Sequence, residues 1–465
     1  MTFISSKHRV KRSFFDKATG KVYDSVADIR GEKELNVMAL PVFLRIGFVP
    51  GNETLFEGIQ CLPGGAEIET EDGQWKIIKK FGYENLINKE AYSNLTEDEL
   101  ISEGKKRWLE IIERLYKPNS KIVVGVSGGF DSRAILAGLL ECTEAKNIST
   151  YTFGIPGSFD FEIGNKVCGQ LGTKHTKLDL TKLEITAEML EKVCILSDGN
   201  ANLFYSMHLI PTMEKFGHDV EYWSGYMGGE FAGSFLPKNP SLTYQKAIEN
   251  YFTREIKRLR LEKPTYDELC EFAKLITSEP EDKDKLSYDE QLDFYNKGER
   301  CWATHYFLSG YDYVTPFVDD KWIEFILSVP TKYRVNKYIY KRIMRRSFPE
   351  LFSLPVKINC GLPLGASALR VNLQKVKHLV AASIFPGFEN PNVCYMDFKK
   401  EIRKESAIKH IIEKSLNAIK KRGIIEQAQV ERLWNEHQSK KQDNSYLLMH
   451  NASLELILKT FGVNV

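Results

Sequence analysis

The sequence predicts an α/β protein, with a small β-rich domain first and a helical part at the end. Three observations lead to this fold class. Short apolar runs alternate with helical patterns between residues 121 and 223, which is typical of right-handed βαβ units and a parallel sheet covered by helices. Gly and Pro dipeptides divide the first part of the chain into short segments, and helical periodicity prevails after residue 314. We therefore expect a β-rich domain over residues 1–90 and an α/β domain with a helical C-terminal extension over residues 91–465.

The composition is that of an ordinary globular protein. Of 465 residues, 43% are hydrophobic and 27% are charged, which excludes disordered and collagen-like chains. Lys and Arg total 64 and Asp and Glu total 62, so the net charge of +2 creates no general attraction for nucleic acid or an anionic membrane. The eight cysteines form no C-x-x-C pair, so no zinc or redox site is predicted. Without a signal-peptide core or a transmembrane run of about 18 apolar residues, the expected compartment is the cytoplasm.

The N-terminal residues are expected to form several short antiparallel strands. A turn is expected at Thr19-Gly20-Lys21, and the run from Leu40 to Phe81 is divided at Pro50-Gly51 and Pro63-Gly64-Gly65. These are turn sequences, because Gly tolerates a positive φ and Pro fixes its own φ. A helix is expected next, since Thr96 to Glu99 form a capping box and apolar residues then recur with a helical period.

The predicted parallel sheet has four strands, each a short run rich in apolar or β-branched residues. They are residues 121–126, 149–153, 175–180 and 218–223. The first is a continuous apolar run, as expected for a strand buried on both faces. Helices are predicted from about Ser132 to Leu140 and over residues 161–172. The charge-rich residues 255–300 are expected to form exposed helices or an insertion, and a loop at 354–365 interrupts the helical C-terminal part.

The stretch VSGGFDSR at residues 126–133 joins the first predicted strand to a helix. Its glycines let the backbone turn tightly and approach a ligand, so the amides of the turn and of the helix start form an anion site. The predicted contacts to this anion come from Val126, Ser127, Gly128, Gly129 and Ser132. Asp131 can hold Mg²⁺ that bridges phosphate oxygens. The stretch lacks the G-x-x-x-x-G-K-[ST] pattern, which argues against a kinase or a motor that cleaves the γ-phosphate.

Five motifs follow one another between about residues 105 and 370. They are SGGFDS at 127–132, YTFG and GSFD between 151 and 160, WSGYMGGE at 223–230, TPFVD at 315–319 and LPVKINCGLP at 354–363. In this order they resemble the asparagine synthetase and β-lactam synthetase family of the ATP-pyrophosphatase superfamily. The resemblance implies the parallel-sheet ATP-pyrophosphatase fold (adenine nucleotide alpha hydrolase-like). It also implies an enzyme that uses ATP and Mg²⁺ to adenylate a carboxylate, releases pyrophosphate and AMP, and joins the acyl group to an amine.

The resemblance implies roles for single residues. Lys357 corresponds to the lysine that stabilises the adenylate and the tetrahedral intermediate, and Asp131 corresponds to the first metal ligand. Tyr226 stands where asparagine-forming members carry an acidic residue. The β-lactam-forming members carry a tyrosine there, which works with a glutamate to deprotonate an amine. The alternative for Tyr226 is an ordinary packed loop residue.

Phe153, Ser224 and Gly225 are expected where adenine and ribose would be held, outside the carboxyl ends of the strands. The alternatives are a core phenylalanine and a turn serine. Asp160 is expected to have a structural role in its loop.

One departure from the family pattern concerns the second metal ligand. The family carries Asp where this chain has Gly229, and Glu230 follows. Glu230 could reach the same ion with its longer side chain, so Asp131 and Glu230 are the expected metal ligands and Glu230 is counted with the catalytic residues. Otherwise the metal site is weakened and the activity is lost or changed.

The N-terminal domain resembles the last strands of the family's glutaminase domain. The resemblance rests on residues 47–59 and 62–65. That glutaminase domain is about twice as long and begins with a nucleophilic Cys, whereas Thr2 is the second residue here and Cys61 is internal. We expect a structural remnant without glutaminase activity, or a docking surface for a partner glutaminase or leader-binding protein.

Three functions are weighed. The first is an amide synthetase that joins a small-molecule or peptide carboxylate to an amine, with no nucleic acid or membrane as partner. The second is a nucleotide- or tRNA-modifying pyrophosphatase, which the lack of a cysteine pair, a zinc motif and a basic face disfavours. The third is a non-catalytic ATP-binding scaffold or partner subunit, which Gly229 and the short N-terminal domain favour. The identity of the carboxylate, and the choice between ammonia and an amine, stay open.

Overall fold

A five-stranded parallel sheet forms the centre of the α/β part, in the strand order β11-β10-β7-β8-β9. The computed structural model describes residues 4–71, 74–276, 284–384, 391–393 and 395–464. The strands of this sheet are β7 (Ile122–Gly125), β8 (Ile148–Gly154), β9 (Lys174–Asp179), β10 (Glu221–Trp223) and β11 (Asp312–Val314). Four of them confirm the predicted strands and the α/β fold class. The fifth, β11, was not predicted, because its three residues carry no recognisable pattern.

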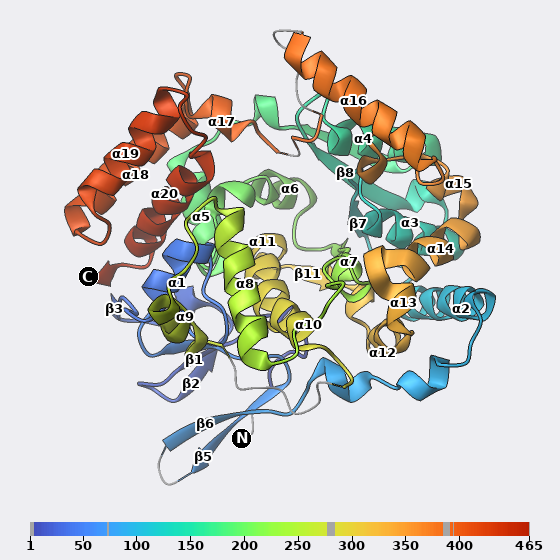
Figure 1. Cartoon of the computed structure of the whole chain (residues 1–465), viewed down its shortest axis with the longest axis horizontal. Helices are drawn as coiled ribbons and strands as arrows, with labels where there is room; N and C mark the ends of the chain where they lie inside the picture. The colour runs from blue at the N-terminus through green and yellow to red at the C-terminus, as the bar shows by residue number, and fades with distance from the viewer. Residues whose placement is uncertain (1–3, 72–73, 277–283, 385–390, 394, 465) are drawn as a thin grey trace.

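Three helices pack beside the first strands of this sheet (Figure 1). They are α2 (Glu97–Leu115), α3 (Asp131–Cys142) and α4 (Phe159–Leu171). Thr96 and Glu99 form the predicted capping box at the start of α2. The indole of Trp108 on α2 donates to the Ala134 carbonyl on α3 at 3.0 Å, which fixes the two helices against each other. Because α3 begins at the carboxyl end of β7, its position sets the position of the glycine loop between them.

The N-terminal residues form two small antiparallel units. A sheet in the order β2-β1-β4 and a hairpin of β5 and β6 account for most of the strands. The strands of this part are β1 (Phe14–Asp16), β2 (Lys21–Tyr23), β3 (Lys33–Glu34), β4 (Ile59–Cys61), β5 (Ala66–Glu71) and β6 (Gln74–Lys79). The turn predicted at Thr19-Gly20-Lys21 joins β1 and β2, with Gly20 at a φ of +66°.

The prediction of strands throughout residues 40–81 is wrong at its beginning. Ala39–Ile46 form helix α1. Its buried residues Ala39, Val42, Phe43 and Ile46 have the spacing i, i+3, i+4 and i+7 of one helix face. This spacing outweighs the strand preference of the individual Val, Phe and Ile side chains.

The charge-rich segment folds into helices that pack with α1 around a small core. They are α8 (Tyr244–Arg258), α9 (Tyr266–Ala273), α10 (Tyr288–Leu292), a π-helix η7 (Asp293–Trp302) and α11 (Ala303–Tyr306). The expectation of exposed helices is wrong for η7, where most residues are buried, including Lys297, Glu299 and Arg300. Lys297 Nζ pairs with Glu255 Oε1 at 2.7 Å and Glu299 Oε2 with Arg9 Nε at 3.6 Å, which offsets the cost of removing these charges from water. Arg300 donates to the Glu53 carbonyl at 2.7 Å.

The C-terminal part is mainly helical, as predicted. Its elements are α12 (Asp320–Ser328), α13 (Thr331–Arg334), α14 (Tyr338–Ser347), α15 (Pro349–Phe352), β12 (Pro355–Val356), β13 (Leu362–Pro363), α16 (Ala368–Ile384), α17 (Phe398–Glu401), α18 (Ala407–Arg422), α19 (Gln427–Gln438), α20 (Ser445–Thr460) and β14 (Val463–Asn464). Between β9 and α8 lie α5 (Ala187–Ser197), α6 (Leu209–Phe216) and α7 (Gly228–Phe231). In Figure 1, α18, α19 and α20 lie together beside α1.

The N-terminal and C-terminal residues share one hydrophobic core. Phe14, Phe43 and Leu55 belong to the same buried cluster as Leu454 and Leu458 of α20. The domain boundary near residue 90 stays a prediction. No helix of the described residues is both long and apolar enough to cross a membrane. The seven cysteines that the structure describes are free, and Cys394 lies outside the described residues.

Candidate active site

The loop after β7 is held by contacts on both sides. The Ser127 hydroxyl accepts from the Gly129 amide at 3.0 Å, within the loop. The Gly128 amide donates to Oδ1 of Asp160 at 3.1 Å, and the Gly128 carbonyl accepts from the Lys357 amide at 3.0 Å. The start of α4 and the late lysine loop therefore fix the backbone that the sequence predicts to be an anion site.

Lys357 lies at this loop because Asp160 holds it there. Its Nζ lies 2.5 Å from Oδ2 of Asp160, the carboxylate that also accepts from Gly128. Asp160 was expected to have only a structural role. Its position between the loop amide and the ammonium makes it a positioning residue for both. No local motif around Asp160 predicts this, because its partners lie 32 and 197 residues away.

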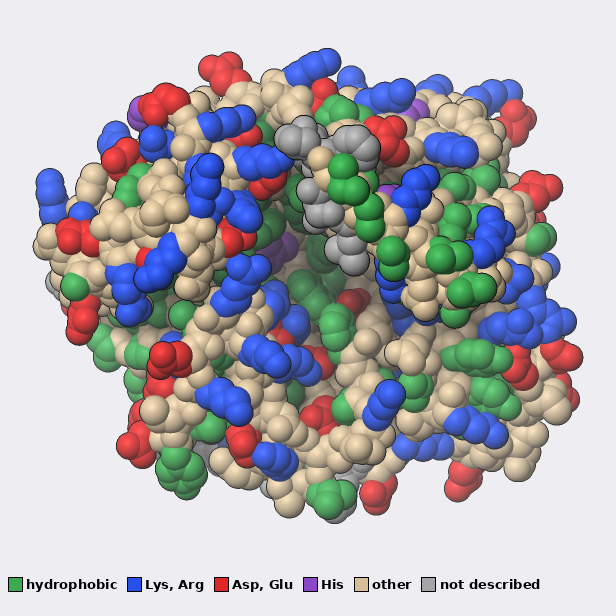
Figure 2. All heavy atoms as spheres, turned by 45° about the horizontal axis from the view of Figure 1, so that its top comes forward, with side chains coloured by type: hydrophobic (Ala, Val, Ile, Leu, Met, Phe, Trp, Pro, Cys, Tyr) green, Lys and Arg blue, Asp and Glu red, His purple; other side chains and the backbone are tan. Residues whose placement is uncertain are grey.

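A cavity of about 480 Å³ opens at the carboxyl ends of β7, β8 and β10, where ligands of open α/β sheets bind. Eleven of the twelve predicted site residues line it. They are Val126, Ser127, Gly129, Asp131, Ser132, Phe153, Ser224, Gly225, Tyr226, Glu230 and Lys357. Gly128, the twelfth, contributes through the contacts described above. We call this the nucleotide cavity, after the ligand that the sequence predicts for it. Figure 2 shows the face of the molecule hollowed near its centre, with Lys and Arg side chains around the hollow.

Asp131 and Glu230 bring two carboxyl groups to the nucleotide cavity. Oδ1 of Asp131 accepts from the Tyr340 hydroxyl at 2.8 Å, and no side-chain cap is formed at the start of α3. Burial raises the pKa of Asp131. Burial, and then the charge of Asp131, raise the pKa of Glu230 to about 7. A cation between the two groups would stabilise their ionised forms.

Lys337 places a positive charge beside Gly229. A Cβ atom at Gly229 would lie 3.3 Å from Nζ of Lys337 and 3.7 Å from Oδ2 of Asp131. The ammonium thus lies next to the backbone position at which the family pattern has a carboxylate. Its charge lowers the pKa of Asp131 and of Glu230, against the effect of burial. No motif marks Lys337, which reaches the site from a turn with Asn336 and Lys337 both in the left-handed region, at φ of 56° and 60°.

Tyr226 is packed more tightly than the other predicted catalytic residues. Its hydroxyl donates to the Gly298 carbonyl of η7 at 3.1 Å, and its ring lies edge-on to Phe307. The side chain is 3% exposed, and burial raises its pKa. These contacts are those of a packed loop tyrosine, so its part in deprotonating an amine stays a prediction.

The residues expected around adenine and ribose lie at the ends of β8 and β10. Phe153 stacks on His208, with 3.7 Å between the ring centroids. The Ser224 amide continues the sheet by donating to the Val314 carbonyl at 2.9 Å. A Cβ at Gly225 would lie 2.9 Å from Cβ of Asp131. The two glycine loops therefore pack directly against each other, and a side chain at position 225 would force them apart.

The carboxylates fit a magnesium ion that the nucleotide helps to hold. Within the part of the chain that the structure describes, no three His, Cys, Asp or Glu side chains could hold a metal together. Mg²⁺ is commonly bound through one or two carboxylates with substrate phosphates and waters completing its shell. Asp131 and Glu230, on one cavity next to the anion loop, meet that description.

Two comparisons with known proteins identify the family of this chain. The family model for asparagine synthase matches residues 113–216 and 308–459, more than half of the chain. A protein of Methanocaldococcus jannaschii named "Putative asparagine synthetase (glutamine-hydrolyzing) 2" is 22% identical over 136 residues. That match covers 29% of this chain and 26% of the relative, so the chain matches about a quarter of the relative's length. Residues 217–307, which carry the second glycine loop and the inserted helices, lie between the two matched parts.

Proposed function

The chain belongs to the asparagine synthase family, and from this premise we propose that it is an AMP-forming amide synthetase. It adenylates a carboxylate with ATP and transfers the acyl group to an amine. The observation that carries the proposal is the link from Gly128 through Asp160 to Lys357, which sets a lysine ammonium beside an anion-binding loop.

The two steps of the reaction balance without a further reactant. A carboxylate oxygen attacks the α-phosphorus of ATP, the bond to the bridging oxygen breaks, and pyrophosphate leaves with the electron pair. The amine nitrogen then attacks the acyl carbon and loses a proton, and AMP leaves with the electrons of the acyl–oxygen bond. Both steps build negative charge that fixed donors can stabilise.

The residues of the nucleotide cavity have separate roles in the two steps. The amides of the loop at Ser127–Gly129 bind the phosphates that leave as pyrophosphate. Lys357, oriented by Asp160, binds the α-phosphate of the adenylate and the oxyanion of the tetrahedral intermediate. Mg²⁺ bound by Asp131 and Glu230 would neutralise phosphate charge. Through that ion Asp131 and Glu230 would orient the triphosphate, and Lys337 adds a fixed positive charge beside them.

The substrates and partners are part of the proposal. The carboxylate and the amine are a small molecule or a peptide, and the amine comes from outside this chain, either free or from a partner such as a glutaminase or a leader-binding protein. Free thiols and a need for ATP fit the cytoplasm as the compartment.

The test is release of AMP and pyrophosphate from ATP and Mg²⁺ in the presence of a small-molecule extract of the source cells. We expect release that depends on the extract, and a loss of at least about 100-fold in Lys357→Ala. Lys414→Ala, on the exposed side of α18, is the matched control and should keep full activity. Equal release by wild type and Lys357→Ala would refute the proposal.

Gly229 and the neighbouring Lys337 favour a second candidate, an ATP-binding scaffold that does not catalyse. Calorimetric titration of the same samples with ATP separates the two. Binding without release in any extract fraction supports the scaffold. Absence of both binding and release excludes both candidates.

A further inference from the structure

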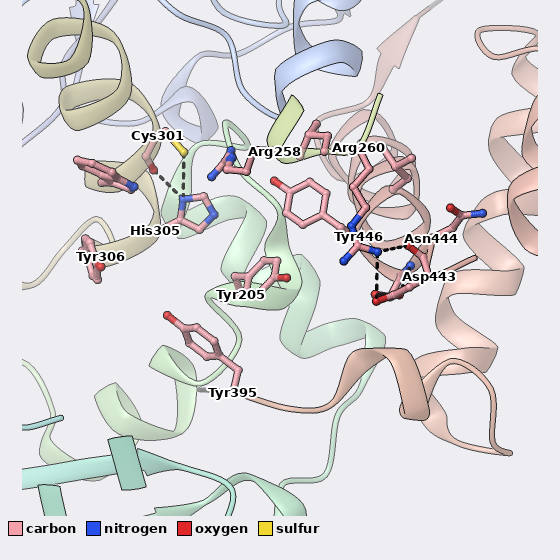
Figure 3. A pocket seen from close by; sticks show the side chains of 14 residues that line it. Tyr205, Arg258, Arg260, Cys301, His305, Tyr306, Tyr395, Asp443, Asn444 and Tyr446 are labelled. Atoms are coloured by element: carbon pink, nitrogen blue, oxygen red, sulfur yellow. Dashed lines mark hydrogen bonds and ion pairs between the residues drawn. The ribbon is translucent and has the colours of Figure 1, made fainter. Parts of the chain in front are cut away.

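A second cavity, of about 490 Å³, lies beside the nucleotide cavity (Figure 3). We call it the aromatic pocket, because five large rings line it. They are Tyr205, Trp302, Tyr306, Tyr395 and Tyr446. Figure 3 shows that Tyr205, Tyr395 and Tyr446 approach it from different segments of the chain. A volume of this size with aromatic walls is typical of a site for a small organic ligand.

The aromatic pocket and the nucleotide cavity share part of their walls. Trp302, Tyr306 and Tyr395 line both. Glu230 and Lys357 line only the nucleotide side. A molecule in the aromatic pocket can therefore extend one end past the shared rings to the residues that bind the nucleotide.

The charged side chains of the pocket are predominantly positive. Arg258 and Arg260 line it together with one carboxylate, Asp443, which lies 3.8 Å from Arg260. His305 contributes no charge at neutral pH. Its Nδ1 donates to the Cys301 carbonyl at 2.7 Å, and burial lowers its pKa to about 4.

Arg258 supplies the positive charge that its neighbours do not neutralise. Its partner Glu255, at 3.4 Å, is fully buried and also contacts Lys297 at 2.7 Å and Arg254 at 3.2 Å. Arg254 also pairs with Asp293, so two carboxylates, Glu255 and Asp293, are shared among three cations. The Arg258 side chain is 41% exposed, so its remaining donors can reach a ligand. A guanidinium binds a planar anion such as a carboxylate through paired hydrogen bonds.

We propose that the aromatic pocket binds a small aromatic substrate whose anionic group pairs with Arg258, while its reacting group enters the nucleotide cavity past Trp302 and Tyr306. The anion at Arg258 is separate from the group that reacts. The substrate is therefore an aromatic molecule with two functional groups, such as a dicarboxylate or an amino acid. This inference rests on the proposed function for the reaction, and it adds the chemical class of the substrate.

Half of the pocket comes from the segment between the two family-matched parts. Arg258, Leu259, Arg260, Cys301, Trp302, His305 and Tyr306 all lie within residues 217–307. Fixed rings in such a wall favour a flat ligand, because aromatic groups stack or meet edge-on.

The test uses two probes with the same ring and opposite charge, 4-hydroxyphenylacetate and tyramine. Binding to the full-length protein is measured by saturation-transfer NMR and calorimetry. We expect 4-hydroxyphenylacetate to bind and tyramine to bind at least tenfold more weakly. Arg258→Gln should weaken binding of 4-hydroxyphenylacetate at least tenfold, whereas Arg370→Gln, at an exposed position of α16, should leave it unchanged.

A second variant covers the case in which Arg258→Gln fails to fold. Ser445→Phe adds a ring to the pocket lining at the start of α20 and keeps Arg258 and Glu255 in the sequence, and it should abolish binding of the probe. Equal binding of both probes, or equal binding by wild type and both pocket variants, would overturn the inference.

Titration with ATP on the same samples distinguishes failure of this inference from failure of the proposed function. If ATP binds and the affinity for the probe does not depend on Arg258, the substrate class is wrong and the proposed function stands. If the affinity for the probe depends on Arg258 and ATP does not bind, the assignment of the pocket stands and the proposed function fails.

Discussion

Asp160 and Asp319 provide a matched pair of aspartates for testing the geometry around Lys357. Asp160 holds the ammonium of Lys357 and the amide of Gly128, whereas Asp319 caps α12 and pairs with Arg114. Asp160→Asn removes the charge that orients the lysine, so we expect pyrophosphate release to fall about 10- to 100-fold. Asp319→Asn keeps a capping side chain and should change release less than threefold. The steady-state rates of both variants check this, and a similar loss in the two would contradict it.

Lys337 should make ATP binding less dependent on magnesium. Its ammonium lies beside Asp131 and Glu230, where it supplies part of the positive charge that a metal ion would supply. We expect Lys337→Ala to weaken ATP binding about tenfold at low Mg²⁺ and less at saturating Mg²⁺, with Lys337→Arg close to wild type. Calorimetric titrations over a series of Mg²⁺ concentrations measure this. The same magnesium dependence in Lys337→Ala and wild type would count against the role.

The residues of the glycine loop could be predicted because they are consecutive in the sequence. Ser127 to Ser132 form a local turn whose chemistry follows from residue types alone. Lys337 and Asp160 act through distant partners, and no local pattern reports those contacts. Tyr226 shows the opposite case, in which a local motif predicts a role that the observed contacts do not support. Its place in a motif predicts catalysis, but the contacts to Gly298 and Phe307 are those of packing.

At the scale of elements, the contact between the two glycine loops should control nucleotide affinity. A side chain at Gly225 would meet Cβ of Asp131 at 2.9 Å, closer than such atoms normally approach. Gly225→Ala should therefore push the loops apart and weaken ATP binding at least tenfold.

Gly169 supplies the control for this substitution. It lies inside α4 with nothing within 4 Å of an added Cβ. Gly169→Ala should leave ATP affinity unchanged and raise the free energy of unfolding by about 0.5–1 kcal/mol. Calorimetry with ATP and urea unfolding check the two variants. Unchanged ATP affinity in Gly225→Ala would show that the loops do not need this close approach.

Long or strongly patterned elements were predicted, and short or ambiguous ones were not. The apolar run of β7 and the capping box of α2 each carry several independent signals. Helix α1 combines residues of strand preference with a helical period, and its packing against the shared core decides the outcome. The π-helix η7 has no known sequence pattern of its own, and it buries charges that composition alone places on the surface.

For the whole molecule, three histidines with lowered pKa values predict a loss of stability in acid. Burial lowers the pKa of His208 to about 3 and of His305 and His450 to about 4. In the unfolded chain these side chains take up protons near pH 6.5, so the unfolded state binds more protons between pH 6.5 and pH 4. Stability should therefore fall as the pH falls through this range, by up to about 3 kcal/mol for each histidine.

Urea unfolding at pH 7, 6, 5 and 4 measures this dependence. His450→Gln can keep a donor to the Phe43 carbonyl, which His450 contacts at 2.9 Å, and it should make the decline less steep. Equal free energies of unfolding at pH 7 and pH 5 would show that the histidines are not held neutral.

The shared core of the first and last residues was beyond prediction from the sequence. Phe43 of α1 and His450 of α20 are 407 residues apart, and the patterns of either segment are complete without the other. Local sequence patterns therefore predict the fold class and the order of the elements. They do not predict that the first and last parts of the chain pack against each other, because that contact forms only in the tertiary structure.

The origin of the aromatic pocket has a consequence for how such proteins diversify. The groups assigned to the adenylating step lie outside residues 244–306, whereas Arg258, Trp302 and Tyr306 lie within this one continuous stretch from α8 to α11. Recombination that exchanged this stretch alone would bring in a different choice of molecule while leaving most of the energy-using machinery in place. Selection could then act on what is joined with little change to how it is joined.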